Sequence, residues 1–292
     1  MIIQVQDLNF TYEAGQAPVL KDLNLQIDEG EYIALIGPNG CGKTTLIRHF
    51  NGLLLATAGE VLVKGSNTRG KSLRAIRSLV GMVFQNPDHQ IIGMSVEEDV
   101  AFGPGNLGLP PLEVRRRVDQ ALATVGLTDL AQRAPHTLSG GQKQLLALAG
   151  LLAMDPQIIV LDEPTSSLDP AGKGMILALL QKLNNQGIGV IHVTQNMEEA
   201  ALADRVLVMD QGRLIADGSP RDILSRVDWL QALGLAPPRV TELMWQLQQA
   251  GEDVDSGIFK VEEACKEIIA LLAQRRGSKL DYAPEGGGTC II

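Results

Sequence analysis

The sequence predicts an α/β fold built on a mainly parallel sheet, and three observations support this prediction. Short apolar runs of strand-like composition recur along residues 1–210. Segments with apolar residues at helical spacing separate the later runs. A glycine-rich stretch also follows one early run and opens a helical segment. Because strands that alternate with helices pair in parallel, we expect a sheet that helices cover on both faces.

The predicted elements begin with strand-type runs over residues 2–35, which we expect to contribute an antiparallel β lobe. A mainly helical stretch at about 95–153 predicts a second, helical lobe. The other elements, in chain order, are a helix over 43–52, a strand over 80–84, helices over 112–125 and 140–153, a strand over 157–162, a helix over 171–185, and strands over 188–194 and 205–210. Together they predict a sheet domain at residues 1–220.

The pattern changes after the turn at residues 217–220, beyond which the sequence predicts helices only. Each predicted helix has apolar residues at i, i+3 or i+4 spacing and a terminal glycine. These helices span 221–234, 238–251 and 260–277. We therefore expect a small C-terminal helical domain at 221–276. Residues 277–292 are glycine-rich and are predicted to be disordered.

The composition indicates a well-packed protein of a reducing compartment. Hydrophobic residues make up 45% of the chain, and the formal net charge of -9 argues against a general nucleic-acid binder. The cysteines Cys41, Cys265 and Cys290 are too few for a disulfide scaffold or a four-ligand zinc site. No run reaches the ~18 apolar residues of a membrane span, and no secretory signal is evident. We therefore expect a soluble protein that can still bind a membrane partner.

The glycine-rich stretch matches the phosphate-binding motif G-x-x-x-x-G-K-[ST] in the strand-to-helix context that the motif requires. Its residues are Gly37, Pro38, Asn39, Gly40, Cys41, Gly42, Lys43 and Thr44, followed by Thr45. Glycines let the loop amides turn toward phosphate oxygens, and the helix N-terminus adds its dipole. Lys43 is expected to reach the β- and γ-phosphates of ATP, and Thr44 to bind Mg²⁺. The alternative is a glycine-rich turn without a ligand.

Two adjacent carboxylates, Asp162 and Glu163, follow the apolar strand at 157–162. Asp162 is expected to bind Mg²⁺ directly or through water, and Glu163 to polarise an attacking water. The alternative is a pair of solvated acids at a strand end. We favour the nucleotide site because the pair lies downstream of the phosphate loop. The sequence therefore predicts a P-loop NTPase that uses ATP and Mg²⁺.

A second predicted helix N-terminus carries the segment Leu138-Ser139-Gly140-Gly141-Gln142. Ser139 is predicted to cap the helix, and the glycines leave amides accessible to a second anion. With this segment, residues 1–220 resemble the ATP-binding subunit of ATP-binding-cassette transporters, for which LSGGQ is the signature. In that family the signature of one subunit closes over the ATP of another. The resemblance therefore implies that Ser139, Gly140, Gly141 and Gln142 complete a partner's site in a dimer.

The resemblance assigns roles to further residues by their position. Tyr12 is similar to the aromatic residue that stacks on adenine, with an ordinary edge-strand tyrosine as the alternative. Gln85 is similar to the glutamine that senses Mg²⁺ and the transmembrane partner, so it joins Thr44 and Asp162 as a metal residue. Asp169 lies in a segment similar to the loop that meets the opposite subunit.

Residues 84–110 resemble one branch of the family more closely, the energy-coupling factor ATPases that power vitamin, cobalt and nickel uptake. Residues 233–251 resemble their C-terminal helical domain. This resemblance implies a second cassette subunit in a homo- or heterodimer, a transmembrane scaffold subunit, a substrate-binding membrane subunit and no nucleic acid. It also implies a peripheral location at the cytoplasmic face of the cell membrane. Asp88 would then lie in the groove for coupling helices, or simply in a turn.

Gln195 departs from the family pattern T-H-[DN]-M-x-E-A, in which a histidine follows the strand. Glutamine keeps a neutral N–H donor of similar reach but has no proton to exchange near pH 7. A role in linking the catalytic groups survives this change, whereas an acid/base role does not. Gln195 therefore keeps open a hydrolysis-impaired regulatory or scaffold cassette as an alternative to an active importer subunit. A soluble cassette ATPase without a transport role is a separate alternative.

Two further side chains carry expectations about their chemical state. Cys41 lies near Lys43 and at a helix N-terminus, and both features predict a lowered thiol pKa and a reactive thiol. His192 lies within the strand at 188–194 and is predicted to be a core or edge histidine rather than a ligand.

Overall fold

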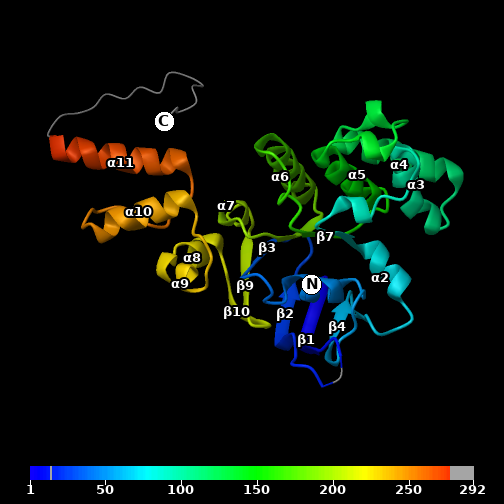
Figure 1. The fold of residues 1–292 in the computed structure, drawn as a ribbon, viewed down its shortest axis with the longest axis horizontal. Helices are drawn as coiled ribbons and strands as arrows, with labels where there is room; N and C mark the ends of the chain where they lie inside the picture. The colour runs from blue at the N-terminus through cyan, green and yellow to red at the C-terminus, as the bar shows by residue number, and fades with distance from the viewer. Residues whose placement is uncertain (14, 277–292) are drawn as a thin grey trace.

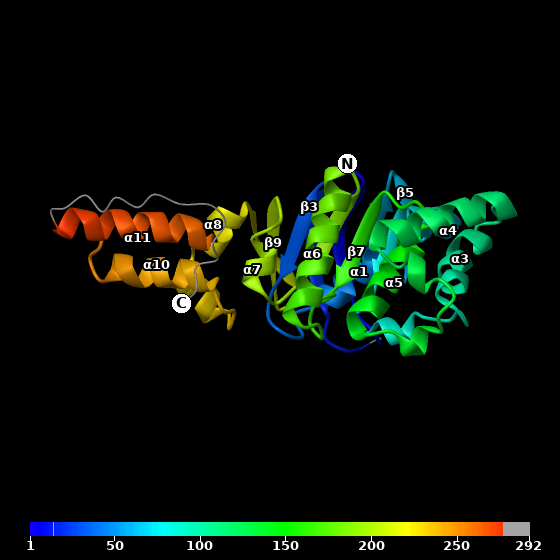
Figure 2. The same cartoon turned by 90° about the horizontal axis from the view of Figure 1, so that it is seen from above.

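The structure, a computed structural model, describes residues 1–13 and 15–276. The disorder predicted for 277–292, and Cys290 with it, lies outside the described residues. The described chain contains two β-sheets, a lobe of helices and a C-terminal helical segment (Figure 1). The molecule is elongated, with the helical lobe at one end and helices α10 (Arg239–Gln249) and α11 (Val261–Arg276) at the other (Figure 2).

A six-stranded sheet forms the centre of the described chain, in the strand order β10-β9-β3-β8-β7-β6. Its strands are β3 (Tyr32–Ile36), β6 (Val80–Val83), β7 (Ile158–Asp162), β8 (Gly189–Val193), β9 (Arg205–Asp210) and β10 (Arg213–Gly218). β10 is antiparallel to β9, and the other neighbouring strands are parallel. Every residue of β3, β7 and β8 is buried, as expected for strands covered on both faces. The predicted mainly parallel sheet is confirmed.

The second sheet is antiparallel, and in the described chain it has the order β2-β1-β4-β5. Its strands are β1 (Ile3–Phe10), β2 (Leu20–Ile27), β4 (Ala58–Val63) and β5 (Ser66–Asn67). This is the β lobe expected from residues 2–35, with two differences. β3 joins the parallel sheet instead, because its uninterrupted apolar sequence suits burial on both faces. The later strands β4 and β5 complete the lobe.

The helices of the sheet domain lie close to their predicted positions; α3 lies within the helical stretch expected at about 95–153, and α2 was not predicted. They are α1 (Lys43–Phe50), α2 (Leu73–Leu79), α3 (Val96–Asn106), α4 (Pro111–Val125), α5 (Gly140–Leu152), α6 (Pro170–Asn185) and α7 (Met197–Ala200), with 3₁₀ turns at Pro87–His89, Thr128–Leu130 and Pro135–Thr137. α3, α4 and α5 pack against one another and form the predicted helical lobe (Figure 1). A reciprocal capping box between Ser95 and Glu98 fixes the start of α3.

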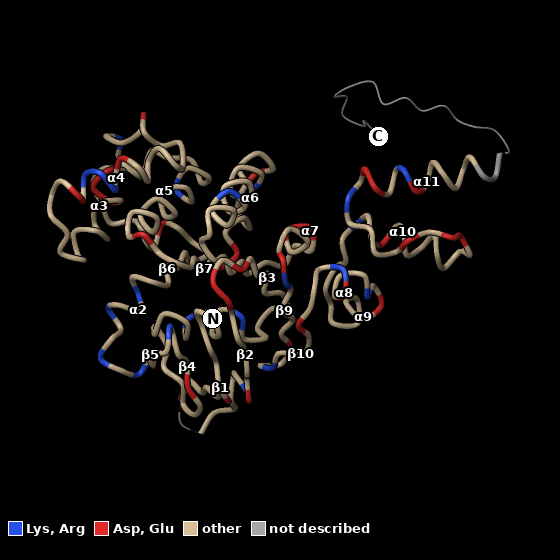
Figure 3. The backbone as a smooth tube through the Cα atoms, turned by 180° about the vertical axis from the view of Figure 1, so that it is seen from behind, with Lys and Arg blue, Asp and Glu red and all other residues tan. Residues whose placement is uncertain are grey.

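The basic run on α4 is paired with nearby acids. Arg115 forms an ion pair with Glu97 at 2.9 Å, and Arg116 and Arg117 each form one with Glu113 at 2.7 Å. Figure 3 shows the resulting mixture of basic and acidic segments along α3 and α4. This surface therefore presents paired charges rather than a patch of one sign.

Two apolar cores lie on opposite faces of the parallel sheet, because alternate residues of a strand point to opposite sides. Tyr32, Ala34 and Ile36 of β3 belong to the core that includes α5 and α6. Ile33 and Leu35 belong to the core shared with α1 and the β lobe. The carboxyl ends of the adjacent strands β3, β8 and β7 therefore lie side by side at one edge of a firmly packed layer.

The C-terminal segment departs from its prediction at one point. The single helix expected over 221–234 is two helices, α8 (Pro220–Leu224) and α9 (Val227–Ala232). Arg226 leaves the helical conformation, and the Ser225 hydroxyl donates to the Arg221 carbonyl at 2.6 Å, a bond that competes with helix continuation. Apolar residues of α8 and α9 join the core beside the sheet, whereas α10 and α11 share a separate small core. No helix in the described chain is both long and apolar enough to cross a membrane.

Candidate nucleotide-binding site

The phosphate loop lies between the end of β3 and the start of α1. Gly37 has a φ of 149°, and a Cβ at this position would overlap the carbonyl oxygen of Met209, so only glycine fits. Gly42 precedes α1 in a left-handed conformation and has no side chain to cap the amides of the first turn. The loop therefore offers backbone amides and a helix N-terminus to an anion, which fits the phosphates of a nucleotide.

Lys43 lies inside this loop, and only 6% of its surface is exposed. Its Nζ donates to the carbonyl oxygens of Gly37 at 2.7 Å and Pro38 at 2.9 Å. These bonds hold the ammonium group within the concave side of the loop. A positive charge at this place is suited to phosphate oxygens, as the sequence predicts.

Tyr12 lies beside the first turn of α1. Its hydroxyl oxygen is 3.1 Å from Thr45 Oγ1, and its ring packs edge-on against Phe10 with the ring centroids 4.8 Å apart. Half of the Tyr12 surface, 52%, is exposed. The ring is thus available for stacking, and the adenine contact stays a prediction.

Thr44 and Asp162 meet at the end of β7. Thr44 Oγ1 donates to Asp162 Oδ2 at 2.8 Å. Burial raises the pKa of the Asp162 carboxyl group, and the hydrogen bond from Thr44 offsets part of this shift. A hydroxyl and a buried carboxylate side by side are oxygen ligands that fit a hard divalent cation such as Mg²⁺.

Glu163 follows β7 with a φ of 49°, a left-handed conformation that is uncommon outside glycine. Its carboxylate accepts hydrogen bonds from two side-chain amides. Gln85 Nε2 donates to Oε2 at 3.0 Å, and Gln195 Nε2 donates to Oε1. The structure thus joins Gln85 to Glu163 rather than to the two oxygen ligands with which the sequence analysis grouped it.

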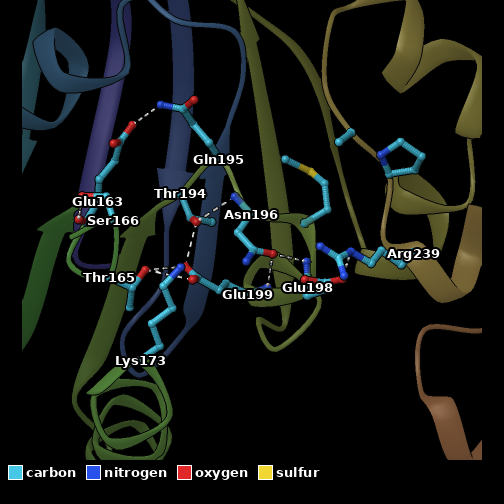
Figure 4. A pocket seen from close by; sticks show the side chains of 13 residues that line it. Glu163, Thr165, Ser166, Lys173, Thr194, Gln195, Asn196, Glu198, Glu199 and Arg239 are labelled. Carbon is cyan, nitrogen blue, oxygen red and sulfur yellow. Dashed lines mark hydrogen bonds and ion pairs between the residues drawn. The ribbon is translucent and has the colours of Figure 1, made fainter. Parts of the chain in front are cut away.

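The Gln195 side chain also connects Glu163 to the phosphate loop. Its Nε2 donates to Asn39 Oδ1 at 2.8 Å in addition to the Glu163 carboxylate. Figure 4 shows Gln195 and Glu163 facing each other at the end of their strands. They border a cavity of about 430 Å³ whose far wall includes Arg239 of α10. Gln195 is therefore placed to link the two parts of the site, the linking role that the sequence analysis left open to it.

The signature segment lies at the start of α5, where Ser139 is the N-cap, as predicted. Ser139 Oγ accepts from the Gln142 amide at 3.3 Å, and Gln142 Oε1 accepts from the Ser139 amide at 2.9 Å. Gly140 lies next to Leu168, and Asp169 caps α6. No hydrogen bond joins residues 139–142 to the phosphate loop in the described part of the chain. Within the described chain, the signature segment is therefore separate from the phosphate loop.

Two contacts near the site were not predicted. Lys143, one residue beyond the signature, forms an ion pair with Asp88 at 2.6 Å and so ties α5 to the turn that follows Gln85. Glu199 of α7 is buried beside His192, which is itself fully buried and is confirmed as a core histidine. The sequence carries no signal of this burial, because Glu198 and Glu199 are adjacent acids and acids are rarely buried.

The predicted lowering of the Cys41 thiol pKa is wrong. Cys41 is 5% exposed and belongs to the apolar core shared with the β lobe. Burial raises the thiol pKa. Lys43, whose Nζ is 3.9 Å from Sγ, and the loop amides lower it, but by less than burial raises it. The sequence places charge near the thiol, but only the fold shows how far the thiol is removed from water.

Maleimide is accordingly expected to modify Cys41 more slowly than Cys265, which is partly exposed on α11. The difference should be about ten-fold or more, because Cys41 is 5% exposed and burial raises its thiol pKa, so both reagent access and the thiolate fraction are reduced. Time-resolved peptide mass spectrometry of the nucleotide-free protein measures both rates, with Cys41→Ser as the control for peptide assignment. Faster labelling of Cys41 would show that the loop opens in solution.

Comparisons with known sequences agree with this geometry. The ABC transporter family model matches residues 20–166. A cobalt import ATP-binding protein, CbiO, of Syntrophus aciditrophicus is 50% identical over 270 residues, which cover 92% of this chain and 96% of that protein. An energy-coupling factor transporter ATP-binding protein, EcfA1, of Caldanaerobacter subterraneus subsp. tengcongensis is 51% identical over 272 residues, which cover 91% and 98%.

Solved structures share the fold. CbiO1 from Clostridium perfringens, described as part of the ABC transporter complex CbiONQ, aligns with a TM-score of 0.73 at 38% identity and covers 84% of this chain and 98% of its own. A dimeric ATP-binding cassette in a post-hydrolysis state, bound to ADP and phosphate, aligns with a TM-score of 0.68 at 31% identity and covers 75% and 99%. This chain therefore belongs to the ABC transporter family, among the ATPase subunits of energy-coupling factor transporters.

Proposed function

We propose that this chain powers the uptake of a micronutrient, a vitamin or a transition metal ion, through an energy-coupling factor importer. The observation that carries the proposal is the meeting of the phosphate loop, the Thr44–Asp162 pair, Glu163 and Gln195 at one edge of the sheet. Relatives about half identical to the chain bear the names of cobalt import and energy-coupling factor proteins, which supports this class of cargo.

The site residues divide the proposed work among them. The loop amides and Lys43 would bind the phosphates of ATP, while Thr44 and Asp162 would hold Mg²⁺. When bound, Mg²⁺ neutralises charge on the phosphate oxygens. Glu163, oriented by its two amide donors, would accept a proton from the attacking water. Gln195 would keep Glu163 aligned with the loop, and hydrolysis would be slow because its amide, unlike an imidazole, does not gain or lose a proton near pH 7.

The proposed partners are a second cassette subunit, a transmembrane scaffold subunit and a substrate-binding membrane subunit, at the cytoplasmic face of the membrane. The separation of the signature from its own phosphate loop supports the second cassette. Around Asp88, the apolar side chains of Ile92 and Met94 are 57% and 84% exposed, which supports a protein contact there. Lys143 already pairs with Asp88, so a basic partner side chain would compete for that carboxylate.

Gln195 also favours a second candidate, a cassette subunit that binds ATP but hardly hydrolyses it and serves as a scaffold. Purification of the chain from membranes, with identification of the co-purified subunits, tests the importer. ATP-driven uptake of cobalt, nickel and a panel of vitamins by the reconstituted complex then tests the cargo. A complex that transports although this subunit shows no turnover of its own would favour the scaffold. A chain that co-purifies with no membrane protein would contradict both proposals.

ATP is expected to drive dimerisation when hydrolysis is blocked, because residues 139–142 would complete a partner's site. The variant Glu163→Gln with saturating Mg-ATP should therefore change from monomer to dimer, alone or mixed with its paired subunit. Analytical ultracentrifugation measures the shift. The same variant with Gly141→Arg is the control, since the added side chain blocks the signature amides. An unchanged sedimentation profile of Glu163→Gln would contradict the nucleotide-sandwich dimer.

A further inference from the structure

Glu199 is a buried carboxylate whose partners lie directly behind the proposed catalytic residues. It belongs to α7, the short helix that begins two residues after Gln195, and only 3% of its surface is exposed. Its neighbour Glu198 points the other way, has a side chain that is 53% exposed and lies 4.0 Å from Arg239. Figure 4 shows the two carboxylates on opposite sides of the α7 backbone.

Three side chains surround the Glu199 carboxylate. Thr165 Oγ1 donates to it, 2.8 Å from each oxygen, and Thr194 Oγ1 donates to Oε2 at 2.8 Å. His192 Nε2 lies 3.4 Å from Oε2. Thr165, Thr194 and His192 are themselves buried. The network is therefore shielded from water, and its bonds are stronger than similar bonds at the surface.

The energetics of burial indicate that this network is held firmly. Burial alone raises the pKa of Glu199, yet the nearby His192 ring and the hydrogen bonds from Thr194 and Thr165 bring it below its ordinary value. The group is thus a carboxylate in the folded protein. A buried charge without its partners is very unfavourable, so separating the segments that carry Thr165 and Thr194 would cost a large free energy.

The two threonines connect the Glu199 network to the segments that carry the proposed catalytic residues. Thr165 lies two residues after Glu163, on the segment that leaves β7, and Thr194 directly precedes Gln195 at the end of β8. The Glu199 carboxylate therefore contacts both the segment that carries Glu163 and the segment that carries Gln195. The side chains of Glu163 and Gln195 are themselves joined by a hydrogen bond. The alternative holds that Glu199 merely stabilises the fold, with no consequence for hydrolysis beyond stability.

We propose that Glu199 is a positioning residue for ATP hydrolysis: through Thr165 and Thr194 it holds Glu163 and Gln195 in the relative position that their contact requires. The proposal rests on hydrolysis by this chain and is independent of the transported cargo. It assigns Glu199 no contact with nucleotide. We call the contacts of Glu199 with Thr165 and Thr194 the clamp. A displacement of about 1 Å at a reacting group is enough to lower the rate about 10²-fold, so loss of the clamp should lower the hydrolysis rate before it lowers ATP affinity.

The test compares two substitutions of the same residue. Thr165→Val keeps the shape and removes the hydroxyl, whereas Thr165→Ser keeps the hydroxyl and removes the methyl group. Single-turnover hydrolysis should slow by about 10²-fold for the valine variant and stay near the starting rate for the serine variant, with equal ATP affinity for all three proteins. Glu199→Gln should resemble the valine variant, and Glu198→Gln, the same change at the exposed neighbour, should resemble the starting protein.

Hydrogen exchange gives a readout that does not depend on turnover. The amides of 165–169 and 194–200 should exchange faster in Thr165→Val than in Thr165→Ser, because the clamp is lost only in the former. Equal rates and equal exchange for the valine and serine variants would overturn the proposal, as would a loss of rate matched by a loss of ATP affinity. If Glu199→Gln fails to fold, the threonine pair decides alone. If the starting protein does not hydrolyse ATP, the proposed hydrolytic function is contradicted. The hydrogen-exchange comparison of the valine and serine variants would still test whether Glu199 holds the two segments together.

Discussion

Replacing Glu163 by glutamine is expected to slow single-turnover ATP hydrolysis by about 10²–10⁴-fold, the usual contribution of a general base. Glutamine has nearly the same volume as glutamate, so the change removes the basic oxygen without opening a cavity. ATP affinity should change little, because Lys43 and the loop amides bind the phosphates. The two properties should therefore separate, with a large loss in rate at nearly constant binding.

The measurement uses excess protein over radiolabelled ATP for the rate, and a fluorescent ATP analogue for the affinity. Glu198→Gln is the matched control, because it makes the same chemical change at a side chain that is 53% exposed and lies 4.0 Å from Arg239. Its rate should equal that of the starting protein. If Glu163→Gln hydrolyses ATP at the starting rate, Glu163 is not the base, and the hydrogen bonds from Gln85 and Gln195 serve only to hold the loop.

The parts of the site that the sequence predicted are those that a short segment encodes by itself. The loop ahead of α1 requires glycine at position 37 because a side chain there would overlap Met209, and this requirement is visible in the motif. Ser139 and Gln142 cap α5 through bonds that span three residues. The apolar run of β7 predicts both its burial and the placement of Asp162 at its end. Local rules are sufficient in each case.

The features that the sequence did not predict depend on contacts between distant segments. Gln85 turned out to bind Glu163, and Lys143 to bind Asp88, across separations of 78 and 55 residues. The thiol of Cys41 was misjudged for the same reason. Its charged neighbours are local and visible in the sequence, whereas the apolar core that raises its pKa is assembled from several elements. One sequence shows which groups are present but not how the fold brings them together.

The same distinction bears on Gln195, whose role the sequence left open. An amide nitrogen carries two hydrogens, and here both have acceptors, the Glu163 carboxylate and Asn39 Oδ1. Gln195→Ala removes both bonds, so we expect hydrolysis to fall by about 10²-fold, the usual cost when a reacting group is displaced by about 1 Å. Gln195→His should instead speed hydrolysis by roughly ten-fold, or about 1.4 kcal/mol of barrier, because imidazole donates and also exchanges a proton near pH 7.

Single-turnover rates of the glutamine, alanine and histidine proteins at saturating Mg-ATP, in complex with the membrane partner, distinguish these roles. The three proteins should bind ATP about equally, since Gln195 contacts Glu163 and Asn39 and the phosphates are assigned to Lys43 and the loop amides. The ordering histidine, glutamine, alanine from fastest to slowest is the expected result. Equal rates for glutamine and alanine would remove the linking role, because two hydrogen bonds would then contribute nothing to the barrier. A histidine protein no faster than the glutamine protein would mean that the contacts around residue 195 suit the amide, and that proton exchange at this position does not limit the reaction.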